Sequence, residues 1–146
     1  MHSLHLRMRQ HSANAMFLAE KFSGLGLTVH YPGLPEHPQH QLLTRLMNPG
    51  YGYGGMLTLD AGSLSNANML MTRMQQEKVG YLAVSLGYFK TLFSAPGHST
   101  SSEIPLEERE AMGLSEGLVR FSVGLDNDIG QSFERIKLCL ADIGVI

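Results

Sequence analysis

One arginine stands out among the residues able to bind a charged ligand. Arg120 lies in the alternating run 118–125, so in a β-strand its side chain points away from the face that Val119 and Phe121 cover. A planar guanidinium holds a carboxylate through two parallel hydrogen bonds, which fixes orientation as well as charge. Strand faces are often half polar, so the pattern alone favours a solvated arginine over a carboxylate-binding one.

Two further polar positions are candidates for ligand contacts. Ser85 ends a strand-like run and is followed by Leu86-Gly87, where a glycine permits a tight turn that offers backbone amides to a ligand. Thr100 lies in a Ser/Thr-rich stretch and could brace a neighbouring side chain by hydrogen bonding. From the residues alone, a plain turn and a flexible polar loop are the stronger interpretations.

Other chemical motifs are weak or incomplete. His37 and His40 have an i, i+3 spacing, but nothing near them completes the three or four ligands that a metal normally needs. The segment 51–55 (YGYGG) leads into a strand rather than a helix, so it does not fit a phosphate-binding loop. Cys139 is the single cysteine and lies in an apolar helical run, which indicates a buried, inert thiol. We expect no catalytic residue and no metal ligand in this chain.

The bulk composition is that of a globular domain. The chain has 146 residues, of which 43% are hydrophobic and 16% charged, and its net charge of -2 gives no bulk attraction to nucleic acid or anionic lipid. One cysteine builds no disulfide framework, which favours a reducing, cytoplasmic compartment. No apolar run long enough for a membrane span and no secretory h-region is found. We therefore expect neither nucleic acid nor membrane as a partner.

The elements that would position these residues alternate between helix and strand. Periodicity and end signals predict helices over 3–23, 38–47, 63–78 (capped by Ser63 or Ser65), 105–112 and 129–143. Strands are predicted at 27–31, 56–60, 81–85 and 118–125, with a turn and short helix at 87–94. This order favours an α+β fold, a small antiparallel sheet of about four strands with helices packed on one face.

The order of short motifs along the whole chain resembles the C-terminal region of the cystathionine/methionine γ-lyase family, the PLP-dependent enzymes of sulfur amino acid metabolism. The sequences of these motifs most resemble those of methionine γ-lyase-like members. The matching segments are LHLRMRQH with NA (4–15), YPGL with HPQH (31–40), GYGGM (52–56), AVSLG (83–87), EERE with G (107–113) and GLVRFSVG (117–124).

The resemblance implies roles for three residues. The family's arginine in the last segment binds the substrate α-carboxylate, which here is Arg120. The serine of AVSLG lies beside that carboxylate, here Ser85, and a threonine before the EERE segment braces the arginine, here Thr100. Tyr88 and Phe89 replace the small residues that many members carry, which leaves side-chain specificity open.

The resemblance also implies what lies outside this chain. The family's lysine that holds PLP lies upstream in an SxTK context, which none of the four lysines has, so pyridoxal 5'-phosphate would be bound by the missing domain. We expect residues 1–24 to form a linking helix from the cofactor domain and residues 25–146 to form the C-terminal, substrate-binding domain. The resemblance thus implies the C-terminal domain of a fold-type I PLP enzyme, preceded by a long linking helix.

The expected activity belongs to a full-length carbon–sulfur lyase that converts a sulfur amino acid to a thiol, ammonia and a 2-keto acid. This chain would supply the carboxylate clamp and be inactive alone. Its partners would be the substrate and the rest of the polypeptide, or lyase subunits, in the family's homotetramer. Two alternatives stay open: a fragment of a γ-replacement enzyme (synthase or sulfhydrylase), and a non-catalytic domain that pairs with a lyase subunit.

Overall fold

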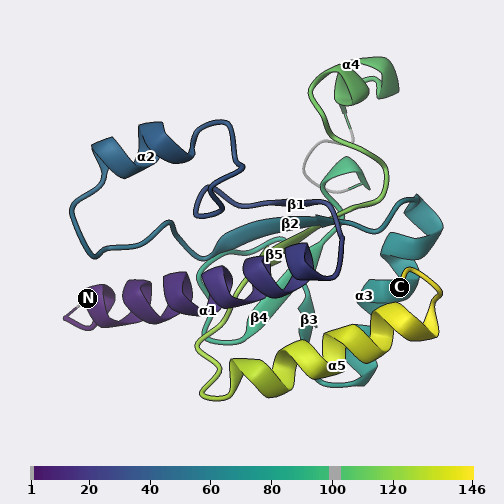
Figure 1. Ribbon diagram of the computed structural model, residues 1–146. Helices are drawn as coiled ribbons and strands as arrows, with labels where there is room; N and C mark the ends of the chain where they lie inside the picture. Colours follow the sequence, from purple (N-terminus) through teal and green to yellow (C-terminus); the bar gives the residue numbers. More distant parts are fainter. Residues whose placement is uncertain (1, 99–102) are drawn as a thin grey trace.

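The computed structural model describes residues 2–98 and 103–146 and contains helices and strands in alternation (Figure 1). The α-helices are α1 (Leu4–Gly24), α2 (His40–Leu46), α3 (Leu64–Gln76), α4 (Leu106–Ala111) and α5 (Ile129–Asp142). The strands are β1 (Val29–His30), β2 (Met56–Asp60), β3 (Gly80–Leu82), β4 (Thr91–Ser94) and β5 (Leu118–Ser122), and a short 3-10 helix, η1, spans Pro96–His98.

The strands form one mixed sheet in the order β1-β2-β5-β4-β3. β2 and β5 are antiparallel neighbours at its centre, with Thr58 opposite Arg120 and Leu57 opposite Phe121. β1 and β4 add antiparallel strands on either side, whereas β3 pairs with β4 in parallel. The α+β class is confirmed. The described residues form a sheet of five strands, where about four were expected. The expectation of an antiparallel sheet is wrong for one pair, because β3 and β4 are parallel.

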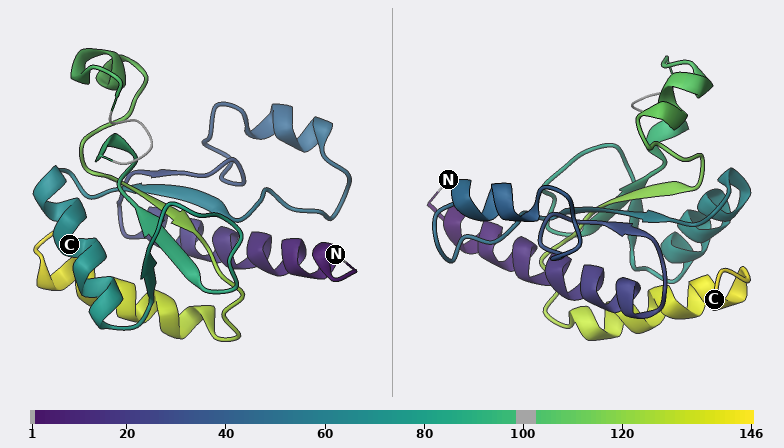
Figure 2. Two further views of the ribbon diagram at one scale, coloured as in Figure 1. Left: turned by 180° about the vertical axis from the view of Figure 1, so that it is seen from behind. Right: turned by 45° about the horizontal axis from the view of Figure 1, so that its top comes forward.

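Three helices cover one face of the sheet and form the core with it. Figure 1 and the two views of Figure 2 show α1, α3 and α5 on this side, while α2 and α4 stand away from it. The fully buried positions include Phe22 of α1, Leu70 of α3, Ile136 of α5 and Phe121 of β5. Strand alternation explains the sheet's contribution, because every second residue of β2 and β5 faces the helices. The predicted packing of helices on one face is confirmed.

β4 is the element that the sequence missed. Residues 87–94 were predicted as a turn and a short helix, but Thr91–Ser94 pairs with β5 through Leu92↔Ser122, Phe93↔Phe121 and Ser94↔Arg120. All four residues of β4 are buried, so they lack the alternation that marks a half-exposed strand. The periodic signal was therefore absent from this strand.

The parallel pairing of β3 and β4 has a direct consequence for the chain between them. Two parallel neighbours both run in the same direction, so the connection must return from one end of the sheet to the other. We call residues 83–90 the crossing segment. It makes its return beside β5, where the carbonyl of Phe89 accepts a hydrogen bond of 2.8 Å from the amide of Leu125.

Polar caps fix the ends of two helices on the core side. Ser63 caps α3, its hydroxyl accepting a hydrogen bond of 3.1 Å from the amide of Asn66, which confirms one of the two predicted caps. Asp128 caps α5 in the same way, accepting a hydrogen bond of 3.0 Å from the amide of Gln131. The boundaries of both helices thus follow from short-range chemistry in the sequence.

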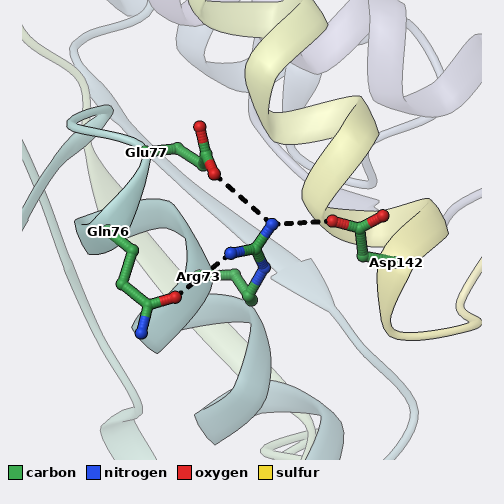
Figure 3. A network of polar contacts seen from close by, with 4 residues as sticks. All are labelled: Arg73, Gln76, Glu77 and Asp142. Atoms are coloured by element: carbon green, nitrogen blue, oxygen red, sulfur yellow. Dashed lines mark hydrogen bonds and ion pairs between the residues drawn. The ribbon is translucent and has the colours of Figure 1, made fainter.

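An ion-pair network joins the C-terminal ends of α3 and α5 (Figure 3). Nη2 of Arg73 lies 2.7 Å from a carboxylate oxygen of Asp142 and 3.3 Å from one of Glu77, and Nη1 donates to the side chain of Gln76. These side chains are partly to well exposed, so water screens the pairs and their contribution is small. The network orients α5 on α3, while the core beneath supplies most of the packing energy.

Within residues 2–98 and 103–146, no helix is both long enough and apolar enough to span a lipid bilayer.

Candidate functional site

Arg120 lies at the middle of the central strand β5, on the face of the sheet opposite the helices. Val119 and Phe121 on either side of it are fully buried in the core, so strand alternation directs Arg120 the other way. Its Nη2 donates a hydrogen bond of 2.8 Å to the carbonyl oxygen of Val84. Its Nε is buried and has no hydrogen-bond partner among the described residues.

A second unpaired polar group lies next to Arg120. Ser94 of β4 pairs in register with Arg120, so both side chains leave the sheet on the same face. Ser94 is 5% exposed, and its hydroxyl also lacks a partner in the part of the chain that the structure describes. Buried polar groups are normally hydrogen-bonded, because leaving one unpaired costs about 1–3 kcal/mol. Arg120 and Ser94 thus place two unpaired donors side by side on this face of the sheet.

The crossing segment brings Ser85 to this place. Val84, whose carbonyl Arg120 contacts, immediately precedes Ser85, and the Ser85 side chain is exposed. Two residues further on, the amide of Gly87 donates a hydrogen bond of 2.9 Å to the hydroxyl of Ser122 on β5. The segment is thus attached to β5 at successive points, and the fold explains why Ser85 and Arg120 are neighbours despite their separation in sequence.

Helix α1 is also hydrogen-bonded to the crossing segment. Nη2 of Arg7 donates a hydrogen bond of 2.9 Å to the carbonyl of Gly87. Gly87 has a φ of 70°, a left-handed conformation that favours glycine. Its amide and carbonyl are therefore both engaged, by Ser122 and Arg7, and the turn that carries Ser85 has a defined position.

The structure brings together two of the three predicted site residues. Arg120 and Ser85 lie within the same small region, while Thr100 lies outside the described residues. Ser94 was missed, because its relation to Arg120 depends on the β4–β5 register and no signal in the sequence predicted β4. Tyr88 and Phe89, which replace the small residues that many family members carry, are exposed, with ring centroids 4.4 Å apart.

The two candidate metal-binding histidines have structural contacts. His37 accepts a hydrogen bond from the amide of Gln39, and His40 lies 2.7 Å from the carbonyl of Pro32 and stacks on Tyr53. Both histidines therefore shape the chain between β1 and α2.

The single cysteine and the glycine-rich segment fit a buried, inert thiol and the entry to a strand. Cys139 is buried as predicted, and burial raises the pKa of its thiol. Residues 51–55 lead into β2, and the carbonyl of Gly54 accepts a hydrogen bond of 2.8 Å from the hydroxyl of buried Tyr31. The segment is anchored as the entry to a strand.

The described residues around Arg120 do not fit the cradle of a covalently held aldehyde cofactor, which needs a lysine. Lys21 lies over the ring of Phe17 on α1, and Lys78 is exposed after α3. Lys90 is also exposed and donates to the hydroxyl of Tyr81, and Lys137 lies on α5, on the other face of the sheet.

Fold and site together define a class: an α+β domain whose central strand carries an arginine with an unpaired Nε. Residues 1–134 match the model of the family described as Cys/Met metabolism PLP-dependent enzyme. The chain belongs to that family.

Individual relatives agree with this assignment. The chain is 47% identical to methionine gamma-lyase of Arabidopsis thaliana over 135 residues, which is 92% of this chain and 31% of that protein. It is 35% identical to cystathionine gamma-lyase of Dictyostelium discoideum, over 91% of this chain and 35% of that protein. A similar solved structure is that of an O-acetylhomoserine (thiol)-lyase from Campylobacter jejuni that carries a pyridoxyl-lysine, with a TM-score of 0.86 and 26% identity over 95% of this chain and 32% of that one.

The chain thus spans about a third of the length of the relatives that it matches.

Proposed function

We propose that this chain is the substrate-binding part of a PLP-dependent carbon–sulfur lyase of the methionine γ-lyase type. The whole enzyme would convert a sulfur amino acid and water to a thiol, ammonia and a 2-keto acid. Pyridoxal 5'-phosphate, when bound by the remainder of the enzyme, supplies the electron sink for this chemistry. The identity of 47% to a methionine gamma-lyase supports this choice of reaction.

One observation carries the proposal: the buried, unpaired Nε of Arg120 beside the unpaired hydroxyl of Ser94. Nε and one terminal nitrogen of a guanidinium form a fork that matches the two oxygens of a carboxylate. An α-carboxylate bound there would satisfy Arg120 and bring the rest of the amino acid beside Ser85. We assign Thr100 a bracing role on Arg120 on the basis of the family resemblance alone.

The contribution of this chain to the reaction is orientation. A carboxylate held at two points cannot rotate, so the α- and γ-carbons of the amino acid take one direction relative to the sheet. Val84, through its carbonyl, limits the guanidinium to one position before substrate arrives. The proton transfers would be carried out by groups of the remainder of the enzyme, so we expect the chain alone to be inactive.

A γ-replacement reaction is the second candidate. It is favoured by the similarity to a solved O-acetylhomoserine (thiol)-lyase, with a TM-score of 0.86. Both reactions use the same carboxylate contact, so Arg120 has the same role in each. A non-catalytic domain that pairs with a lyase subunit is a third arrangement, and in all three the partner would be lyase polypeptide, in the homotetramer typical of the family.

The carboxylate contact is testable on the chain itself. The side-chain Nε–H resonance of Arg120 should move on titration with L-methionine and stay in place with L-methioninamide, which lacks the carboxylate. Arg120→Lys should weaken L-methionine binding by at least tenfold, because a lysine cannot form the two parallel hydrogen bonds. Arg109→Lys is the matched control, since Arg109 is another arginine with a buried, unpaired Nε.

Equal responses to the acid and the amide would refute the clamp, as would equal losses in the Arg109 and Arg120 variants. For the activity, the chain is assayed with PLP and L-methionine alone. We expect no 2-keto acid and no absorbance band near roughly 420 nm of the kind that a lysine–cofactor bond gives and borohydride removes. A stoichiometric band at one lysine, with keto acid released, would show that the chain is a complete enzyme.

A further inference from the structure

A pocket lies between α1 and the glycine-rich loop that leads into β2. Its volume is about 450 Å³, within the range of about 300–1,000 Å³ that is typical of small-molecule sites. It opens to solvent, since several of the residues around it are exposed. Helix α1 contributes Arg9, Ser12 and Met16 to the lining, and the loop contributes Tyr51, Gly52 and Tyr53.

The loop is fixed against α1 without any ligand. Figure 1 shows the chain returning from α2 to β2 beside this helix. The amide of Gly54 donates a hydrogen bond of 3.1 Å to the hydroxyl of Ser12, and the hydroxyl of buried Tyr31 donates one of 2.8 Å to the carbonyl of Gly54. Gly52 has a φ of 82°, and an added Cβ there would lie 2.7 Å from Cβ of Ser12. The walls of the pocket are therefore preorganised, and a ligand does not have to order them.

Arg9 gives this pocket a positive charge that no neighbouring side chain neutralises. The lining residues include no Asp or Glu, and the Arg9 guanidinium has no hydrogen-bond or ion-pair partner among residues 2–98 and 103–146. Arg9 is exposed, so a ligand that enters from solvent can reach it. A guanidinium carries five N–H donors and a permanent charge, which suits a carboxylate.

The rest of the lining suits an aromatic ring. The side chain of Tyr51 is 52% exposed, so its ring is available for stacking, and the thioether of Met16 makes favourable contacts with aromatic rings. Tyr53 is held in place, because its hydroxyl lies 2.7 Å from that of Thr44 and its ring stacks on His40. Arg9 and Met16 are two helical turns apart, about 10 Å along the axis of α1. A ligand that contacts both must therefore carry its charge several bonds away from its ring.

We propose that this pocket binds a small aromatic carboxylate whose charged group pairs with Arg9 and whose ring packs against Tyr51 and Met16. A neutral ring would leave Arg9 without a counter-charge, and a small anion would leave the aromatic lining uncovered. None of these contacts involves Arg120, Ser85 or Ser94. The proposal thus goes beyond the proposed lyase function and does not rest on it.

The test compares hydrocinnamate with hydrocinnamamide, a neutral amide of nearly the same shape. Both probes are titrated into the whole chain at low ionic strength, because salt screens an exposed ion pair. Calorimetry gives the affinities, and the backbone amide resonances of Gly50 and Gly52 report whether the probe is in this pocket. Arg120 also offers a guanidinium to a carboxylate, so Arg120→Lys is titrated in parallel. We expect that variant to bind hydrocinnamate as the wild type does, which separates this pocket from the proposed carboxylate clamp.

Two variants of exposed residues divide the contacts between charge and ring. Arg9→Gln should weaken hydrocinnamate about fivefold, the size of one exposed ion pair, and change hydrocinnamamide by less than about 1.5-fold. Tyr51→Ala should weaken both probes about threefold, because each loses the same stacking contact. Arg45→Gln is the matched control, since Arg45 on α2 is another exposed arginine without a partner in the described part of the chain. It should leave both affinities unchanged.

Four results would overturn the proposal. Equal affinities of the acid and the amide for the wild-type chain would mean that Arg9 binds no carboxylate. Equal losses in the Arg9 and Arg45 variants would reduce the effect to net charge. An acid affinity that falls in Arg120→Lys but not in Arg9→Gln would place the probe at Arg120. Amide resonances of Gly50 and Gly52 that stay unmoved at millimolar hydrocinnamate would show that the pocket binds no ligand of this class.

Discussion

Asn14 should be one of the most sensitive positions for the stability of this domain. Its amide nitrogen donates to the carbonyl of Gly124 at 2.9 Å and to that of Asp126 at 3.1 Å, while its oxygen accepts from Gln10 at 2.8 Å. The side chain is 2% exposed, so water cannot replace these contacts. Asn14 therefore satisfies the polar backbone just after β5.

Asn14→Ala removes two buried donor contacts at once. Each lost hydrogen bond costs about 1 kcal/mol, and a carbonyl left buried and unpaired adds to this, so we expect a loss of about 2–4 kcal/mol in the free energy of unfolding. That is a large part of the stability of a domain of this size. The measurement is urea unfolding followed by circular dichroism, read as a two-state transition.

An isosteric variant separates the chemistry from the change in volume. Asn14→Asp keeps the shape but turns a carboxylate oxygen toward two carbonyl oxygens, so near neutral pH it should be at least as destabilising as Asn14→Ala. Burial and the carbonyls favour the protonated carboxyl in the folded state, so its folded pKa lies above its unfolded one. The stability that protonation supplies is then lost as pH rises, and the variant should recover relative to wild type between about pH 7 and about pH 5.

Gln10→Ala serves as the control, because Gln10 is exposed and its side-chain amide donates to the oxygen of Asn14. It should cost less than about 1 kcal/mol. An Asn14→Asp variant as stable as wild type at neutral pH, or one whose stability does not improve on acidification, would refute the reasoning. Either result would mean that the carbonyls of Gly124 and Asp126 find other partners.

Three further predictions concern the core and the sheet. Gly80→Ala should destabilise by about 1–3 kcal/mol in urea unfolding and loosen the β3–β4 pair in amide exchange, because an added Cβ would lie 2.0 Å from the carbonyl oxygen of Thr91; unchanged exchange protection would contradict this. Phe121→Ala should cost about 3–5 kcal/mol, since this ring is fully buried at the centre of the sheet, and calorimetric unfolding measures it. Burial raises the pKa of Tyr31 above its ordinary value of 10.0, so the folded state favours the neutral phenol. The stabilisation that this raised pKa gives the folded state is complete below about pH 10 and decreases as pH rises above it. Tyr31→Phe should therefore show a shallower decline of the unfolding free energy between about pH 9 and about pH 10.5.

Elements with a strong local pattern were predictable from the sequence. β2 has the predicted bounds of 56–60, because its residues alternate between buried and half-buried. The three core helices were predicted for a similar reason, since their apolar residues recur at helical spacing. Ser63 shows that even a helix end was accessible to short-range reasoning.

Features that depend on distant pairing were not predictable. β4 is buried throughout and lacks periodicity, and its parallel pairing with β3 is set by tertiary structure. Ser94 became a candidate only through its register with Arg120. The hydrogen bond of His11 to the end of β5 likewise depends on where α1 meets that strand. Arg120 and Ser85 became candidates through the family resemblance, and their roles stay predictions, as does the role of residues 1–24 as a link to a further domain. The groups that surround them were not predicted.

The second half of α1 packs into the core, while residues 2–10 extend past the sheet (Figure 1). A helix of 21 residues is about 31 Å long, so α1 reaches from the core to well beyond it. His11 and Asn14 join its middle to the end of β5 by hydrogen bonds. Arg7, one turn earlier, joins it to the crossing segment, so this one helix is hydrogen-bonded both to the end of the strand that holds Arg120 and to the chain that holds Ser85.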